Sequence, residues 1–328
     1  MLSGKFIRKP VYVIVSLTCC FVVESCAKED IIYYELETER IDTITVEYKP
    51  NEDVGLQDAV KVTQFASLGI AHQSAAAYGD YVVFVSNGRS SFHLFNLKTK
   101  SLLCGLEMKA LNSMIYHCNQ SSFGVEKFDP SDPFPLLYIS QNAKTDQRCF
   151  IEVFRILPVI DEVQKEYSSF SIELIQTVFL PPMSETNSLG NVNCAIDSDN
   201  RVMYTYSRNN NAGEGNYGIC KINQFALPDF HEEEVTLEDE NILSSFMIDC
   251  KAFNMQGGCI KDGFLYIGQG YSLVGYIYLN VIELNKRKLV RRIDLEDCHV
   301  SWEPEGCFVY DGCLMLSHTS AISEIKIN

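Results

Sequence analysis

Five segments of the chain repeat one order of polar and hydrophobic positions. Each begins with a polar side chain and continues through mostly small residues into a hydrophobic stretch and a tight turn. The copies start 46, 74, 63 and 49 residues apart. They begin Gln73-Ser74-Ala75, Asn119-Gln120-Ser121, Asn193-Cys194-Ala195, Gln256-Gly257-Gly258 and Glu305-Gly306-Cys307. Because strand-like repeats of several tens of residues are typical of β-propellers, the pattern predicts an all-β propeller with five blades.

A turn and a second strand follow most of the copies. In four of them a turn residue stands seven positions after the polar residue: Asp80, Asn200, Gly263 and Gly312. A short apolar run follows each turn, at residues 81–85, 201–205, 264–268 and 313–317. Two strands joined by such a turn form a hairpin, so these are the expected strands A and B of four blades.

Each blade needs four strands, of which A is innermost and D outermost. The strands expected in blades one and two are 73–77, 81–85, 92–97 and 101–106, then 119–123, 136–140, 150–156 and 174–180. Those expected in blades three and four are 193–196, 201–205, 218–222 and 234–237, then 256–260, 264–268, 278–284 and 289–295. Blade five has only 305–309, 313–317 and 323–327.

The last blade therefore lacks an outer strand when the chain ends. A ring left open there would present a long unpaired strand edge. Residues 60–65 are strand-like and have no other place in the repeats. We expect them to pair with residues 323–327 and close the ring. The alternative, a sixth blade, would have to come from residues 31–58, which hold no copy of the repeat.

The first residues have the features of a signal peptide. Lys5, Arg8 and Lys9 precede an apolar run at residues 11–23, which is too short to span a bilayer as a helix. The sequence Val23-Glu24-Ser25-Cys26 is similar to a bacterial lipobox, from which Glu24 departs.

These features divide the chain into three parts. We expect residues 1–25 to be a lipoprotein signal peptide, residues 26–58 a lipidated Cys26 with an acidic tether, and residues 59–328 the propeller. Lipid on Cys26 would hold the protein to a membrane without a spanning segment. Cys19 and Cys20 are alternatives, although cleavage at either would cut the apolar run. A secreted chain without lipid is a further alternative.

Composition narrows the possible partners. The chain has 328 residues, 46% of them hydrophobic, which is enough for a large core. Its formal net charge of −16 argues against nucleic acid as a partner and against adsorption to anionic lipids. Ten cysteines follow Cys26, and no two form a C-x-x-C pair, so zinc ribbons and thioredoxin-like motifs are not supported. Disulfide pairing cannot be read from the sequence, and buried free cysteine packs as a small hydrophobe.

Candidate ligand-binding residues gather at the start of each innermost strand. In a propeller these starts surround one mouth of the central channel, and residues i and i+2 of a strand point the same way. Trp302, the single tryptophan, stands beside Glu303. The polar residues at or just before the strand starts are His72, Gln73, His117, Asn119, Asn191, Asn193, Asn254, Gln256, Glu303 and Glu305.

Two interpretations of this set stay open. Amides that recur in every blade can hydrogen-bond the neighbouring blade, and Trp302 can fill a gap between blades. The histidines and glutamates, in contrast, add ionisable groups where a scaffold needs only amides. An aromatic ring beside carboxylates and amides suits a sugar, whose apolar face stacks while its hydroxyls form hydrogen bonds. The set therefore indicates a polar ligand site at this mouth.

Catalysis is the alternative to binding. Glycoside hydrolysis needs two carboxyl groups flanking one bond, typically about 5–9.5 Å apart. Glu303 and Glu305 lie on the same strand, so the sequence favours non-enzymatic binding of a glycan or protein partner over a hydrolase or metal-dependent enzyme that uses these two glutamates. No metal-ligand spacing and no nucleotide-binding motif occurs, so we expect no cofactor.

The layout as a whole resembles the β-propeller lipoproteins found on the surface of Bacteroidetes bacteria. The resemblance rests on the lipobox-like stretch, on Ala27-Lys28-Glu29-Asp30, which is similar to their acidic export signal, and on the five repeats. It implies a lipid-anchored protein on the outer face of the outer membrane. Glu303-Pro304-Glu305-Gly306 also resembles the E-x-E-G strand start of several propeller families, some of them enzymes and others not. It is too short to transfer an activity.

Overall fold

The computed structural model describes most of the chain after residue 60. The signal segment, Cys26 and the tether lie outside the described residues. Across the part that is described, no helix is both long and apolar enough to cross a membrane. The described residues are 61–70, 72–86, 91–107, 118–145, 148–163, 165–182, 192–208, 219–249, 255–270, 277–295, 300, 303–318 and 321–326.

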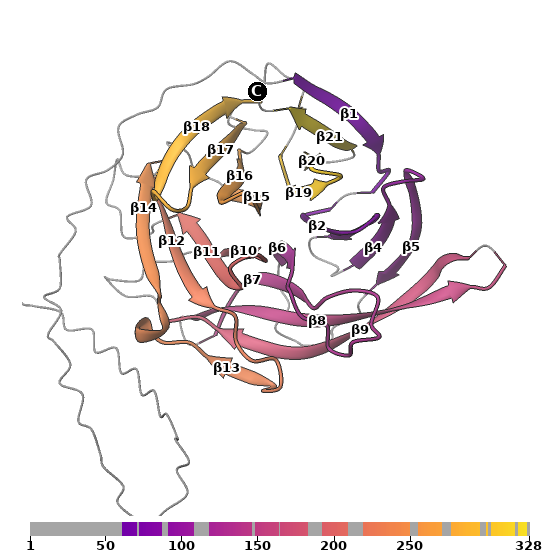
Figure 1. Ribbon diagram of the computed structural model, residues 1–328, viewed down its shortest axis with the longest axis horizontal. Coiled ribbons are helices and arrows are strands. Elements are labelled where there is room, and N and C mark those ends of the chain that lie inside the picture. The colour runs from indigo at the N-terminus through magenta and orange to yellow at the C-terminus, as the bar shows by residue number, and fades with distance from the viewer. Residues whose placement is uncertain are drawn as a thin grey trace, which may run out of the picture. The chain divides into compact units, whose positions relative to one another are not determined.

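The described strands form five sheets, arranged as blades around a common axis (Figure 1). Blades one and two contain β2 (Ser74–Tyr78), β3 (Tyr81–Val85), β4 (Ser91–Asn96) and β5 (Ser101–Glu107), then β6 (Cys118–Phe123), β7 (Leu137–Thr145), β8 (Arg148–Asp161) and β9 (Glu166–Phe179). Blades three and four contain β10 (Asn193–Asp197), β11 (Val202–Arg208), β12 (Ile219–Ala226) and β14 (Ser244–Asp249), then β15 (Met255–Lys261), β16 (Phe264–Gln269), β17 (Tyr278–Glu283) and β18 (Lys288–Asp294). Blade five contains β19 (Gly306–Tyr310), β20 (Cys313–His318), β21 (Ala321–Lys326) and β1 (Lys61–Ser67).

The predicted closure of the ring is confirmed. β1 is the outer strand of blade five and pairs antiparallel with β21, with Val62 opposite Ile325 and Thr63 opposite Glu324. Leu68, just after β1, is 5% exposed in a core that also contains Phe84 of blade one. The first and last described strands are thus held in one sheet, and the prediction of five blades holds.

Hydrophobic cores fill the spaces between adjacent blades. Five clusters of buried side chains are present, and each combines residues of two neighbouring blades. The cluster between blades five and one includes Phe308 and Met315 on one side and Phe95 on the other. Alternate residues of a strand face opposite sides of the sheet, so a blade buried on both faces reads as a nearly continuous apolar run. This is the pattern of Tyr81–Val85 in β3.

The tight turns between strands A and B explain several of the recurring residues. Asp262 and Gly263 connect β15 to β16 with φ of 52° and 78°. Asp311 and Gly312 connect β19 to β20 with φ of 49° and 72°. Two successive residues with positive φ define a type I′ hairpin turn, for which Asp-Gly is a preferred pair. The turns at the predicted Gly263 and Gly312 are therefore set by local backbone chemistry.

The outer strand of blade three differs from the prediction. Residues 234–237 were expected there, but the strand that pairs with β12 is β14. Glu234–Thr236 forms β13, which pairs parallel with β9 as a fifth strand of blade two. The physical reason is burial: β14 turns Phe246 and Ile248 into the core between blades three and four, whereas β13 has both of its terminal residues exposed.

Blade two also carries a hairpin longer than predicted. β8 and β9 stay paired from Phe150 opposite Phe179 out to Asp161 opposite Glu166. In Figure 1 the hairpin projects past the outer edge of blade one. Part of its length is anchored there, since the rings of Tyr81 and Tyr167 lie 4.9 Å apart between centroids.

Candidate functional site

Two of the predicted amides link neighbouring blades. Asn119 Nδ2 donates a hydrogen bond to the carbonyl oxygen of Val192 at 3.0 Å. Asn193 Nδ2 donates to the carbonyl oxygen of Met255 at 3.4 Å, a longer contact of the same kind. Each bond runs from the start of one inner strand to the backbone beside the next, and so braces blade two against blade three and blade three against blade four.

The other two amides meet the glutamates. Gln73 Nε2 donates to Glu305 Oε2 at 2.6 Å. Gln256 Nε2 donates to the carbonyl oxygen of Gly270 at 3.1 Å and lies 3.4 Å from Glu303 Oε2. Blades one, four and five therefore contribute side chains to one cluster, and four of the predicted site residues are brought together.

Glu303 and Glu305 form a hydrogen-bonded carboxyl pair, the name used below for these two side chains. Glu305 is buried and Glu303 is partly exposed. The pKa of Glu305 is raised to about 10, mainly by burial and in smaller part by the hydrogen bond and negative charge of Glu303. At neutral pH Glu305 is thus a neutral acid that can donate a proton to a hydrogen bond with the more exposed Glu303.

His72 lies in a different environment from the carboxyl pair. Its side chain is 6% exposed, and its ring packs edge-on against Phe84 with 4.8 Å between centroids. Burial lowers the pKa of His72 to about 4, so the ring is neutral at physiological pH. Phe84 belongs to the core between blades five and one. The remaining predicted site residues, His117, Asn191, Asn254 and Trp302, lie outside the described residues.

A side chain that the sequence reading overlooked crosses the channel. Gln120 Nε2 donates to the carbonyl oxygen of Gly258 at 2.7 Å and to that of Ser121 at 2.8 Å, and the side chain is fully buried. The first bond joins blade two to blade four, which are not adjacent in the ring. The repeat marks Asn119 but not Gln120, because Gln120 occupies a position that is small in the other copies.

Glycine permits this close approach. A Cβ atom on Gly257 would lie 2.3 Å from the carbonyl oxygen of Glu305 and 2.5 Å from Gln120 Oε1. One on Gly258 would lie 2.6 Å from the hydroxyl oxygen of Tyr206. These distances are too short for real Cβ contacts, so the start of β15 can contact its neighbours in this way only without side chains.

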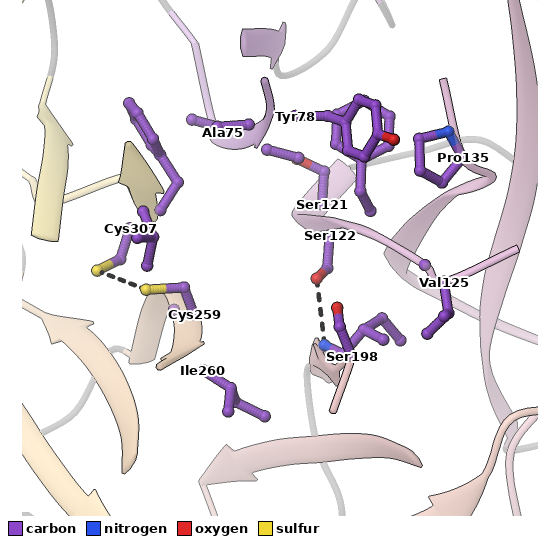
Figure 2. A pocket seen from close by; sticks show the side chains of 18 residues that line it. Ala75, Tyr78, Ser121, Ser122, Val125, Pro135, Ser198, Cys259, Ile260 and Cys307 are labelled. Carbon is purple, nitrogen blue, oxygen red and sulfur yellow. Dashed lines mark hydrogen bonds between the residues drawn. The ribbon is translucent and has the colours of Figure 1, made fainter. Parts of the chain in front are cut away.

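A pocket of about 380 Å³ opens along the later residues of the inner strands (Figure 2). Small side chains such as Ala75, Ser121 and Ser122 form much of its wall, and Tyr78 and Phe123 add aromatic surface. All of its lining side chains are uncharged. The carboxyl pair comes from the opposite end of the inner strands, so the channel has a charged, amide-rich end and an uncharged pocket.

Within the described ranges, no group of three or more His, Cys, Asp or Glu side chains is placed to hold a metal ion. The two carboxyl groups of the pair already accept hydrogen bonds from Gln73 and Gln256.

Comparison with known proteins gives only distant structural similarities. No family model matches the sequence, and no curated protein matches it. Among solved structures, glutaminyl cyclase of Myxococcus xanthus is similar with a TM-score of 0.42 at 9% identity, covering 82% of this chain and 94% of that one. A luciferin-regenerating enzyme gives 0.37 at 11% identity over 82% and 80% of the two chains, and Kuenenia stuttgartiensis hydrazine synthase gives 0.37 at 10% over 74% and 60%. The five sheets themselves define the protein as a five-bladed β-propeller.

Proposed function

We propose that this protein is a lipid-anchored propeller on the cell surface that binds a glycan, without catalysis, at the end of the channel that carries the carboxyl pair. The observation that supports this most directly is the partly exposed Glu303 beside the buried, neutral Glu305. Lipidation of Cys26 and export to the outer face of the outer membrane rest on the lipobox-like sequence and the acidic residues that follow it.

The chemistry of this end suits a polyhydroxylated ligand. The Glu303 carboxylate accepts hydrogen bonds from hydroxyl groups. It is held in place because Gln256 donates to it and Glu305 is hydrogen-bonded to it. Trp302 is adjacent to Glu303 in the sequence, and an indole ring is a side chain that can stack on the apolar side of a sugar ring. One anchored carboxylate with an aromatic neighbour is a common way to orient a sugar without cleaving it.

The same geometry disfavours hydrolysis. Two catalytic carboxyl groups must flank the scissile bond from opposite sides, at least about 5 Å apart. Glu303 and Glu305 hydrogen-bond to each other, and Gln73 donates to Glu305 at 2.6 Å. Glu305 is therefore hydrogen-bonded to both Gln73 and Glu303, and no substrate atom fits between the two carboxyl groups.

A glycan array with the purified chain carrying Cys26→Ala, so that no lipid is attached, tests the proposal. We expect binding to a defined set of glycans, a loss of at least tenfold in affinity for Glu303→Gln, and a nearly unchanged melting temperature for that variant. The matched control is Glu162→Gln, on an 82% exposed side chain of the β8–β9 hairpin. Binding that Glu303→Gln leaves intact would contradict the proposed site. Release of new reducing ends from a bound glycan would instead favour the enzyme alternative.

A further inference from the structure

Two cysteines from adjacent blades touch in the wall of the pocket. Cys259 Sγ in β15 and Cys307 Sγ in β19 lie 3.3 Å apart, as the dashed line in Figure 2 shows. Both side chains line the pocket. Cys307 also belongs to the core between blades four and five, and Cys259 packs against that core. Cys118, Cys149, Cys194 and Cys220 are buried in other cores between blades and do not line the pocket.

We propose that Cys259 and Cys307 form a disulfide that ties blade four to blade five. The proposal rests on the proposed export of the protein, because disulfides persist in oxidising compartments outside the cytosol. The sequence left the pairing of ten cysteines open, whereas the structure places these two in contact.

The backbone around the two cysteines explains why they meet. Gly257 and Gly258 precede Cys259, and Gly306 precedes Cys307. A Cβ atom on Gly257 would lie only 2.7 Å from the Cα atom of Gly306, so the two strands approach each other where neither has a side chain. The sulfur atoms must close by roughly 1.3 Å, from 3.3 Å to the usual disulfide bond length. Rotation of side chains already in contact can supply a change of this size.

The pocket gives an oxidant access to the pair. Cys259 is partly exposed and Cys307 is 1% exposed. A small disulfide such as oxidised glutathione would therefore react first at Cys259, forming a mixed disulfide and releasing one glutathione thiol. Attack by Cys307 Sγ on Cys259 Sγ then releases the second thiol. The two protein thiols lose two electrons and two protons, and the oxidant gains both, so the exchange balances.

The bond would strengthen the ring beside its point of closure. It would link residues 48 positions apart, in a loop that includes the rest of blade four. Closing such a loop in the unfolded chain lowers the entropy of that state, and the oxidised protein should melt roughly 5–10 °C above the reduced one. β1 is the outer strand of blade five, and the cross-link joins blade five to blade four. If β1 separates from β21, the disulfide would still hold blades four and five together.

Mass spectrometry of the full chain after treatment with oxidised glutathione tests the pairing directly. Trypsin should release Cys259 in residues 252–261 and Cys307 in residues 293–326, where Cys298 and Cys313 are also present. We expect a cross-linked species of these two peptides that dithiothreitol separates. It should persist in Cys313→Ser and Cys298→Ser and disappear in Cys259→Ser and Cys307→Ser.

A melting curve provides the second readout. The difference between oxidised and reduced protein should vanish in Cys259→Ser, whose half-buried position tolerates a hydroxyl better than that of Cys307. If both cysteines stay open to alkylation after oxidation, or if the link moves to Cys298 or Cys313, the proposal is wrong. Because these measurements need no glycan, their failure would leave the ligand proposal standing. If oxidation of the purified chain links Cys259 to Cys307 but protein freshly isolated from cells carries both as free thiols, the pairing is correct and the export proposal is wrong.

Discussion

Gln120 Nε2 lies 2.7 Å from the carbonyl oxygen of Gly258 and donates a hydrogen bond to it across the channel, from blade two to blade four. Other hydrogen bonds between blades, such as that from Ser74 to Ser121, join neighbours in the ring. The Gln120 contact ties together two blades that share no hydrophobic core. The bond is made where the two ends of the channel meet. Its acceptor residue, Gly258, lines the pocket, and the preceding residue, Gly257, contacts the backbone of Glu305.

Gln120→Ala should lower the free energy of unfolding by roughly 1–3 kcal/mol, because the carbonyl oxygens of Gly258 and Ser121 lose a buried donor. Urea denaturation followed by tyrosine and tryptophan fluorescence measures the change. Gln64→Ala, at an exposed position of β1, is the matched control and should stay within about 0.5 kcal/mol of the parent protein. Equal effects of the two substitutions would show that the bond across the channel contributes nothing to stability.

Gly257→Ala should be more damaging than its single added methyl suggests. The new Cβ would lie 2.3 Å from the backbone oxygen of Glu305, which cannot move without displacing β19. Overpacking of this kind costs typically about 1–3 kcal/mol or more. Gly105→Ala is the control, because the nearest atom there, at 2.8 Å, belongs to the movable ring of His93. Thermal unfolding of both variants should show the larger loss for Gly257→Ala, and the reverse order would contradict the packing argument.

The fold was predictable where local chemistry decides it. Turn residues such as Gly263 and Gly312 mark hairpins by their own backbone preference, and the unassigned run before residue 66 had one open edge to occupy. The outer strand of blade three was not predictable in this way. Val235 and Phe246 both lie in short segments with strand-like hydrophobic residues, and the packing of the neighbouring cores determines which segment pairs with β12.

The site was predictable only in part for a related reason. The repeat marked Gln73, Gln256, Glu303 and Glu305 as one group, and the structure brings them together. A repeated sequence pattern does not predict the contacts of residues that depart from that pattern. Gln120 stands where other copies have a small residue, and Cys259 and Cys307 occupy different positions within their copies. Their contacts depend on the distance between strands far apart in sequence.

Lipid attachment is expected at Cys26, in the segment that precedes the propeller. Cys26→Ala should abolish labelling by a radioactive or alkyne-tagged fatty acid and release the protein into the soluble fraction after cell disruption. Cys19→Ala and Cys20→Ala serve as controls, since both lie in or beside the apolar run and should leave labelling unchanged. Continued membrane association of the Cys26→Ala protein would count against lipid anchoring at this residue.

The stability of the folded protein should depend on pH through Glu305. Burial and the neighbouring Glu303 raise the pKa of Glu305 in the folded protein to about 10, above its ordinary value of 4.5. The folded state therefore holds a proton that the unfolded state loses above about pH 4.5. The associated stability is fully present below that pH and declines as pH rises through this window toward 10.

Glu305→Gln should remove this decline. The glutamine amide can still accept from Gln73 and can donate to the Glu303 carboxylate, so the hydrogen bonds of the pair are kept without a titrating proton. Between pH 5 and pH 8 we expect the parent protein to lose about 4 kcal/mol more unfolding free energy than the variant. Urea titrations at both pH values measure the difference, and Glu162→Gln, at an exposed residue, should follow the parent. Parallel pH profiles for Glu305→Gln and the parent would mean that Glu305 ionises normally in the folded protein. Glu305 would then not be the neutral hydrogen-bond partner of Glu303 that the proposed site requires.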